Sequence, residues 1–229
     1  MVRPFDVAKA IRDIESNSVH LGLQLRDDIL QLLRKEAAAA TQVEASAPWR
    51  RVDEDLRRAN TTLAAPVLIV NCESSSLQRA ALGVAQDAQL VAVVTHLLGR
   101  APRGFHLRIQ DSLVAKADIA FRESRSQTVM FHYDVHALVF AYVFFYLSDV
   151  DRDSGAHEVI RGSHRGKRLR HLLGTSRHGD EDVYAVYGRD RALLIEGAAG
   201  TGFIEDSSCF HRALPPLCNH RLVLQIRYS

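Results

Sequence analysis

The most informative stretch of this sequence is Phe131-His132-Tyr133-Asp134-Val135-His136, which stands at the mouth of a long apolar run. Successive side chains of a β-strand point to opposite faces, so His132 and Asp134 share one face and can bind one metal ion together. A third ligand has to come from elsewhere in the chain. His211, 79 residues further on (211 minus 132), lies in the strand-like segment Cys209-Phe210-His211-Arg212. The pattern predicts a metal site formed by His132, Asp134 and His211.

Two histidines and one carboxylate form the facial triad of non-haem iron(II) oxygenases, which leaves metal positions open for a cosubstrate and oxygen. Arg221 follows ten residues after His211 (221 minus 211) and opens the last candidate strand. A rigid guanidinium fork suits bidentate binding of a carboxylate better than a lysine would. The distal carboxylate of 2-oxoglutarate is the obvious ligand for this arginine.

Beyond Arg103, short apolar or alternating segments are separated by Gly, Asp, Ser and Asn, a pattern typical of an antiparallel all-β unit. Roughly eight such strands are what a double-stranded β-helix, the cupin-like jelly roll, requires. A polar, basic insertion over residues 162–182 interrupts them, and we expect it to form a loop with some helix. The candidate strands cover residues 105–109, 128–133, 138–147, 157–160, 192–195, 202–205, 209–213 and 221–228.

The first hundred residues differ, because their apolar residues recur mainly at helical spacing. Predicted helices run from Ser18 to about Ala40 and from Leu77 to Leu98, with a shorter helical piece around Asp53 to Asn60. Residues 65–70 are expected to form a short strand or an extended connector. We therefore expect an α+β protein with a mainly β core, in which residues 1–229 form a single domain. Its parts are a mainly helical N-terminal part over residues 1–100 and a jelly-roll core over residues 101–229.

Composition narrows the class of protein. A hydrophobic fraction of 47% and a charged fraction of 24% are ordinary for a globular protein, and a net charge of +2 is too small to indicate a nucleic-acid partner. The three cysteines, Cys72, Cys209 and Cys218, are scattered, which fits free thiols in the cytoplasm better than a disulfide framework. The longest apolar run, from Ala137 to Leu147, is too short to span a bilayer, so no membrane partner is expected.

The order of motifs resembles the phytanoyl-CoA dioxygenase family over about Leu77 to Tyr228. In that family an HxD motif precedes a strand ending in YLTDVD-like residues, a GSH motif follows, and a histidine and an arginine close the sequence. The matching stretches here are Phe144-Phe145-Tyr146-Leu147-Ser148-Asp149-Val150-Asp151-Arg152-Asp153-Ser154-Gly155 and Gly162-Ser163-His164-Arg165-Gly166. A departure is Arg161, where the family commonly has proline before GSH.

This resemblance implies a dioxygenase that uses iron(II), 2-oxoglutarate and oxygen to hydroxylate an unactivated C–H bond of a small molecule, releasing succinate and carbon dioxide. It assigns His132, Asp134 and His211 as the catalytic iron ligands and Arg221 as the 2-oxoglutarate anchor. Related halogenases replace the carboxylate by a small residue, so Asp134 favours hydroxylation over halogenation. Desaturation, cyclisation and epimerisation remain open, as do the substrate and the oligomeric state.

Four further residues have two interpretations each. Gln127 and Tyr142 stand where related sequences place groups near the cosubstrate, but an exposed strand residue and plain core packing are the respective alternatives. His164 of the GSH motif either lines the substrate pocket or holds a loop through a backbone hydrogen bond. His136 is expected to face the substrate rather than to bind the metal.

Two other classes of function compete with an oxygenase. A cupin-like binding protein would explain histidines inside a barrel, but it gives no reason for Arg221 or for the four ordered motifs. A zinc hydrolase could use His132, Asp134, His136 and His211, but it lacks an evident general base such as the glutamate of HExxH. Neither alternative would consume 2-oxoglutarate. The basic run over residues 161–171 is either an attraction for an anionic substrate or a solvated surface.

Overall fold

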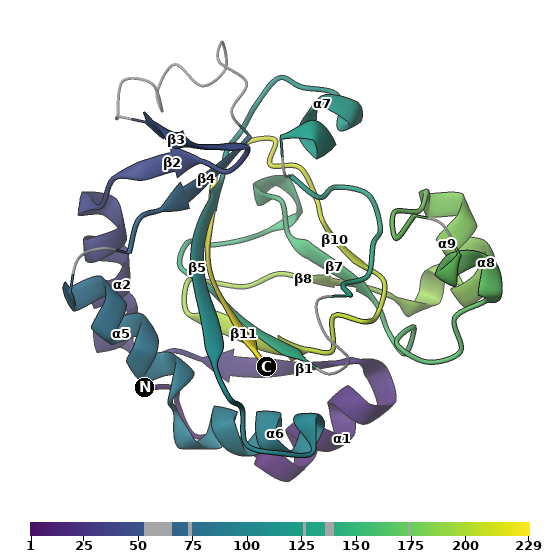
Figure 1. Cartoon of the computed structure of the whole chain (residues 1–229), viewed down its shortest axis with the longest axis horizontal. Coiled ribbons are helices and arrows are strands. Elements are labelled where there is room, and N and C mark those ends of the chain that lie inside the picture. The colour runs from purple at the N-terminus through teal and green to yellow at the C-terminus, as the bar shows by residue number, and fades with distance from the viewer. Residues whose placement is uncertain (53–65, 73–74, 126, 136–139, 174) are drawn as a thin grey trace.

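Two antiparallel β-sheets pack against each other in the centre of the molecule (Figure 1). The computed structural model describes residues 1–52, 66–72, 75–125, 127–135, 140–173 and 175–229. The larger sheet has eight strands in the order β1 (Val19–Gln24), β9 (Thr201–Glu205), β6 (Ala141–Tyr146), β11 (Arg221–Tyr228), β5 (Phe105–Ser112), β4 (Val67–Val70), β2 (Gln42–Glu44) and β3 (Ala47–Val52). The smaller sheet has β10 (His211–Ala213), β7 (His157–Ile160) and β8 (Ala192–Ile195) in that order. The predicted jelly roll is confirmed, without closure into a continuous barrel.

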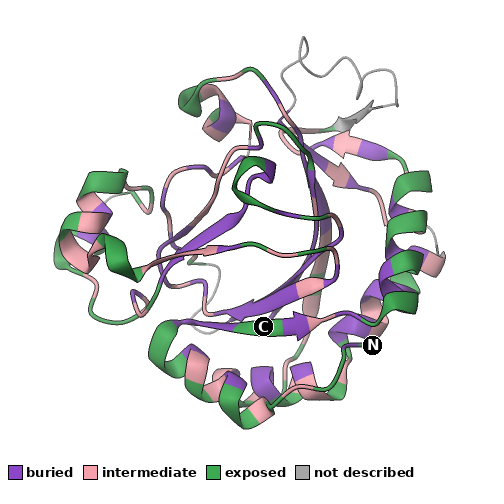
Figure 2. Cartoon of the chain, turned by 180° about the vertical axis from the view of Figure 1, so that it is seen from behind, coloured by how far each residue is buried: buried purple, intermediate pink, exposed green. Residues whose placement is uncertain are grey.

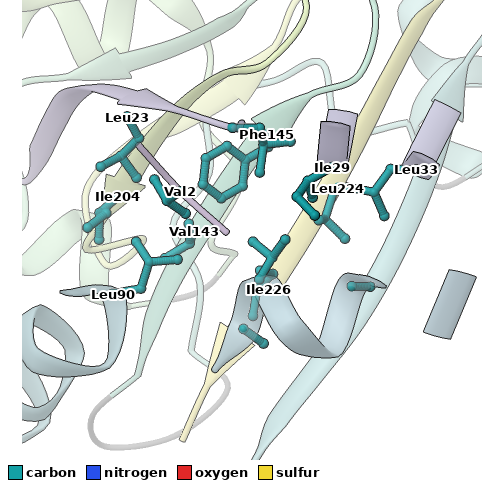
Figure 3. Packing of buried hydrophobic residues seen from close by; sticks show 14 of the residues in the cluster. Val2, Leu23, Ile29, Leu33, Leu90, Val143, Phe145, Ile204, Leu224 and Ile226 are labelled. Atoms are coloured by element: carbon teal, nitrogen blue, oxygen red, sulfur yellow. The ribbon is translucent and has the colours of Figure 1, made fainter. Parts of the chain in front are cut away.

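Side-chain alternation divides the interior into two hydrophobic layers. On β11, Leu224 and Ile226 point to the helix side of the large sheet, while Val223 points to the space between the sheets. The helix-side layer also holds Val143, Phe145 and Ile204 (Figure 3). The layer between the sheets includes Phe144, Tyr146, Val159, Ile195 and Phe203. The side chains of β5, β6 and β11 that enter the space between the sheets therefore line the interior of the jelly roll.

Four helices cover the outer face of the large sheet, namely α1 (Val7–Asn17), α2 (Asp27–Ala39), α5 (Ser75–Ala85) and α6 (Ala88–Leu98) (Figure 1). Their inner faces are buried and their outer faces exposed (Figure 2). The described residues also form helices α7 (Ile119–Ser124), α8 (Leu169–Leu172) and α9 (Asp180–Tyr187), with short 3₁₀ turns at η1 (Arg152–Ser154) and η2 (Arg189–Arg191). As expected, the insertion after residue 162 contains helix. Its helices α8 and α9 lie at the edge of the molecule opposite α2 and α5 (Figure 1).

The prediction of one helix from Ser18 to Ala40 is wrong in its first part, because strand β1 occupies residues 19–24. Leu21, Leu23 and Leu25 alternate with polar residues or glycine, so they fit a strand as well as a helix. Ser18 and Gly22 have positive φ angles of 69° and 97°, which stop α1 and mark an irregularity in β1. Helix α2 then begins at Asp27.

The described part of the N-terminal hundred residues thus supplies four strands as well as four helices. The predicted strand within residues 65–70 is confirmed as β4, and the predicted helix from Leu77 to Leu98 is divided into α5 and α6. Asp87 causes the division, because its side chain caps the first turn of α6 by accepting from the backbone of Gln89. The helical piece predicted at residues 53–60 lies outside the described residues.

The predicted strands beyond Arg103 are matched closely. The structure has strands over 157–160, 192–195 and 221–228 with the predicted bounds. Residues 128–133 differ, because they form only isolated bridges, from Phe131 to His178 and from His132 to His211. None of the described helices is by itself long and apolar enough to cross a membrane. Helices α5 and α6 have the necessary length and apolar composition only when taken together, and a bend of 55° separates them.

Candidate active site

Three side chains with metal-binding atoms converge between the sheets. His132 and Asp134 come from the segment before β6, and His211 begins β10. A pair of backbone hydrogen bonds of 2.9 and 2.8 Å joins His132 to His211, so the two imidazoles lie side by side with ring centroids 4.2 Å apart. One ligand atom from each of the three residues lies within 4.8 Å of the others, and the separation between His211 Nε2 and Asp134 Oδ2 is 3.8 Å. We call these three residues the facial cluster.

The backbone sets which nitrogen of each imidazole is available. Nδ1 of His132 lies 3.1 Å from the carbonyl oxygen of Met130, and Nδ1 of His211 lies 3.1 Å from that of Cys209. A carbonyl only accepts, so each Nδ1 carries the proton and each Nε2 is left with a lone pair for a metal. Burial lowers the pKa of His132 to about 3 and also lowers that of His211. Both rings are therefore neutral at pH 7, as metal ligands must be.

A second layer of polar groups supports His211. Glu205, at the end of β9, is fully buried, and its Oε1 lies 3.2 Å from His211 Nδ1. Its other oxygen lies 2.7 Å from Nε2 of His157, which stacks on His211 at 5.4 Å between ring centroids. Burial raises the pKa of Glu205 to about 7 and lowers that of His157 to about 3. A carboxylate behind a metal-binding histidine orients the ring and raises its basicity.

The facial cluster opens into a cavity of about 230 Å³ whose lining is mostly polar. Arg221 lies in its wall and is 4% exposed. One terminal nitrogen of Arg221 donates to the Gly155 carbonyl oxygen and the other lies 3.3 Å from Ser112 Oγ, while its Nε has no hydrogen-bond partner. The buried carboxylate of Asp111 acts on Arg221 electrostatically, and the Nε of Arg221 still has a donor hydrogen with which it can bind a carboxylate of a ligand.

Comparison with solved structures finds the same architecture. HygX from Streptomyces hygroscopicus, solved with nickel, 2-oxoglutarate and hygromycin B bound, is 13% identical and has a TM-score of 0.59, over 96% of this chain and 86% of that chain. The non-heme alpha ketoglutarate dependent carbocyclase SnoK from nogalamycin biosynthesis is 15% identical, with a TM-score of 0.63 over 99% and 86%. EctD from S. alaskensis, solved with 2-oxoglutarate and 5-hydroxyectoine, is 16% identical, with a TM-score of 0.60 over 97% and 75%.

This chain has the fold of the iron(II)/2-oxoglutarate-dependent oxygenases. No protein-family model and no curated protein matches the sequence, so the likeness is one of structure. The sequence resembles the phytanoyl-CoA dioxygenases, and the similar solved structures agree with that resemblance.

Two residues predicted to lie near a cosubstrate line the cavity of this oxygenase fold. Gln127 is 2% exposed, and its Oε1 accepts a hydrogen bond of 2.6 Å from Arg122. Its amide nitrogen is buried without a partner, so its two donor hydrogens are available to a ligand. Tyr142, on β6, also lines the cavity, and burial raises its pKa while Arg227 and Arg108 oppose that effect. Both side chains therefore lie where an oxygenase cosubstrate or substrate can reach them.

Sequence reasoning missed several residues of this wall. Arg108 and Gln110 on β5 and Gln225 on β11 line the cavity, with Arg108 directly opposite Gln225 in the strand register. Burial lowers the pKa of Arg108, whose Nε has no hydrogen-bond partner. Alternation along β5 and β11 could have signalled these residues, because Arg108 and Gln110 share a face with Ser112, and Gln225 shares one with Arg221.

The two predicted substrate residues have different outcomes. His164 is not among the residues that line the cavity, and its Nε2 lies 3.2 Å from the carbonyl oxygen of Glu15 in α1. This contact matches the alternative interpretation, in which the histidine of the GSH motif holds a loop through a backbone hydrogen bond. His136 lies outside the described residues.

Proposed function

We propose that this protein is an iron(II)- and 2-oxoglutarate-dependent dioxygenase that hydroxylates a C–H bond of a polar small molecule, with release of succinate and carbon dioxide. The observation that carries the proposal is that one cavity holds both the facial cluster and the buried guanidinium of Arg221, whose Nε has no hydrogen-bond partner. His132, Asp134 and His211 would hold the iron, since two neutral imidazoles and one carboxylate are the donor set that this metal uses.

The iron, when bound, supplies oxygen activation coupled to decarboxylation of the 2-oxoglutarate. The protein's own residues bind and orient the reactants. Arg221 binds the distal carboxylate of the cosubstrate through charge-assisted hydrogen bonds, and the amide of Gln127 donates to the same cosubstrate or to the substrate. Glu205 holds the His211 ring in the orientation that directs Nε2 to the metal. We propose that residues 1–229 act together as one catalytic domain, because β1 and β4 flank the strands that line the cavity.

The lining of the cavity supports a polar substrate. Three arginines, Arg108, Arg212 and Arg221, lie in the wall with only one carboxylate, Asp134, among the residues described there. Arg212 is neutralised by Glu158 at 2.7 Å and Asp180 at 2.6 Å, whereas the Nε atoms of Arg108 and Arg221 have no hydrogen-bond partner. A small molecule with an anionic group fits this wall better than an aliphatic chain does. The same fold holds hygromycin B in HygX and 5-hydroxyectoine in EctD, which supports a small-molecule substrate without indicating its charge.

The reaction outcome is the finer part of the proposal. The carbocyclase SnoK has the same fold, so the fold does not distinguish hydroxylation from cyclisation. The reaction product does. The presence of Asp134 supports hydroxylation over halogenation. Mass spectrometry of the product checks it, because hydroxylation adds one oxygen atom and cyclisation adds none.

The test is anaerobic addition of iron(II) to metal-free protein with 2-oxoglutarate, followed by admission of oxygen. We expect the weak visible charge-transfer band of the chelate and then succinate. The control variant Asp153→Ala, which alters an exposed carboxylate in η1, should behave as the unmodified protein. The variant Asp134→Ala should form no succinate. Absence of both band and succinate in the unmodified protein would sink the oxygenase proposal and favour a cupin-like binding protein or a zinc hydrolase.

A further inference from the structure

A second group of metal-binding side chains lies in the insertion, outside the cavity. His171 at the end of α8, His178, and Asp182 in the first turn of α9 place one ligand atom each within 4.8 Å of the others. We call these residues the insertion cluster. None of the three lines the cavity at the facial cluster.

The distances within the insertion cluster suit a shared ion. Nε2 of His171 and Nδ1 of His178 each lie 3.2 Å from the same oxygen, Oδ2 of Asp182. Two ligands bound at about 2.0 Å to a tetrahedral zinc ion are separated by about 3.3 Å. The other carboxylate oxygen, Oδ1, is held by Arg170 at 2.8 Å, which orients Asp182 and leaves Oδ2 facing the two rings.

Several buried polar atoms around the insertion cluster lack a partner. The side chain of His171 is fully buried, and neither of its ring nitrogens makes a hydrogen bond, despite the short distance from Nε2 to Asp182. Nε2 of His178 and the hydroxyl of Tyr187, whose ring lies 6.2 Å from that of His171, are also buried without partners. Of these atoms, Nε2 of His171 is the one that faces Asp182. Buried polar groups are nearly always satisfied, so the missing hydrogen bond of this nitrogen supports a bound ion.

The insertion cluster packs directly against both segments that carry the facial cluster. The backbone of His178 donates to Phe131, the neighbour of His132, at 2.8 Å, and the hydroxyl of Tyr133 donates to the His171 carbonyl oxygen at 2.8 Å. Phe210, the neighbour of His211, makes edge contacts of 5.2 Å with both His171 and His178. An ion at the insertion cluster would therefore fix α8 and α9 against the backbone that positions the facial cluster.

We propose that His171, His178 and Asp182 bind a divalent transition-metal ion of the zinc type, which holds the insertion against the facial cluster. Two imidazoles and one carboxylate supply three ligands, and water completes a tetrahedral site. The role is structural, because the cluster is packed among aromatic rings and away from the cavity. The proposal does not depend on which metal the facial cluster binds.

The experiment uses the full chain with the variant Asp134→Ala as background, because this variant weakens the facial cluster. Metal-free protein is titrated with zinc against a chromophoric chelator, and the same protein is examined with cobalt(II) by visible absorption. We expect about one tightly bound zinc per chain and the strong bands of tetrahedral cobalt. Adding Asp182→Asn should lower the zinc affinity at least tenfold and remove those bands, since an amide is a poorer metal ligand than a carboxylate.

The matched control is Asp134→Ala with Glu181→Gln, which removes one negative charge from the neighbouring position of α9. Glu181 is exposed and pairs with Arg189, so zinc binding should be unchanged. His178→Gln provides a second test of the cluster, and in each variant that binds zinc the melting temperature should rise with zinc concentration. The proposal is overturned if the Asp134→Ala background binds no zinc, or if the additional Asp182→Asn change leaves the affinity and the cobalt spectrum as they were.

Discussion

Glu205 lies directly behind His211, with its Oε1 3.2 Å from Nδ1, the ring nitrogen opposite the one that faces Asp134. The two residues are on different strands and in different sheets, β9 and β10. Burying a carboxylate costs free energy unless it is paired, and Glu205 contacts both His157 and His211, so it can hold the His211 imidazole in place.

Glu205→Gln should therefore weaken metal binding at the facial cluster by about 10-fold to 100-fold. The amide keeps the shape of the side chain but loses the charge that supports the ring. Anaerobic titration with iron(II) or cobalt(II) measures the effect. Glu158→Gln, which alters a carboxylate that contacts Arg212 instead, should leave metal affinity unchanged. Equal affinities for both variants would contradict the orienting role.

Arg221→Lys should lower the affinity for 2-oxoglutarate at least tenfold while leaving iron(II) affinity as it is. Lysine keeps the charge but loses the planar fork, and a hydrogen bond to a charged group contributes about 1.5–3 kcal/mol. Titration of the chelate band with 2-oxoglutarate gives the cosubstrate affinity, and a separate anaerobic titration with iron(II) gives the metal affinity. Arg103→Lys, at an exposed position, is the control. An unchanged cosubstrate affinity in Arg221→Lys would show that this arginine is not the anchor.

Gln127→Glu should weaken cosubstrate binding without destabilising the fold. The new carboxylate can still accept from Arg122, but its free end becomes an acceptor that repels an anion. We expect a fall of about tenfold in 2-oxoglutarate affinity, measured by the same titration, and no loss of melting temperature. Gln86→Glu, on the surface after α5, controls for the added charge. Tighter binding of 2-oxoglutarate by Gln127→Glu would rule out the donor role.

Arg108→Met should stabilise the fold and weaken the recognition of an anionic substrate. Burial of the unpaired guanidinium costs free energy, so its removal should raise the free energy of unfolding by about 1 kcal/mol, which is about 2–4 °C in melting temperature for a chain of this length. Succinate release stimulated by carboxylated or phosphorylated candidate substrates should fall, while 2-oxoglutarate affinity stays the same. Stimulation of the unmodified protein by neutral molecules alone would argue against an anionic substrate.

Gly202→Ala should destabilise the fold by about 1–3 kcal/mol, because overpacking a core forces shifts of neighbouring groups. A Cβ at this position of β9 would meet the ring of Phe145 and lie 2.7 Å from the carbonyl oxygen of Phe144. Urea unfolding measures the change. Gly104→Ala is the matched control, since a Cβ there has no atom within 4 Å, and its effect should stay within about 0.5 kcal/mol. Similar losses in the two variants would contradict the packing argument.

The strand that carries Arg221 and several of its neighbours were predictable because their signals are local, whereas the strand predicted at 128–133, next to Asp134, forms only isolated bridges. Strands 157–160, 192–195 and 221–228 have bounds that alternation and turn residues mark directly. The ordered motifs with His132, Asp134, His211 and Arg221 likewise needed only spacing along the chain. The strand β1 was missed because the spacing of Leu21, Leu23 and Leu25 fits a strand as well as a helix. Only the pairing with β9 selects the strand.

The residues that complete the site were decided by tertiary contacts. Glu205 and His157 become partners of His211 only when β9, β7 and β10 come together, and nothing in their sequence separation indicates it. Arg108 enters the cavity through its register with Gln225, 117 positions away (225 minus 108). His171, His178 and Asp182 meet because α8 and α9 pack behind Phe131 and Phe210. Spacing along the chain indicates ligands that are close in sequence, such as His132 and Asp134, whereas contacts between distant strands depend on the packing of the whole core.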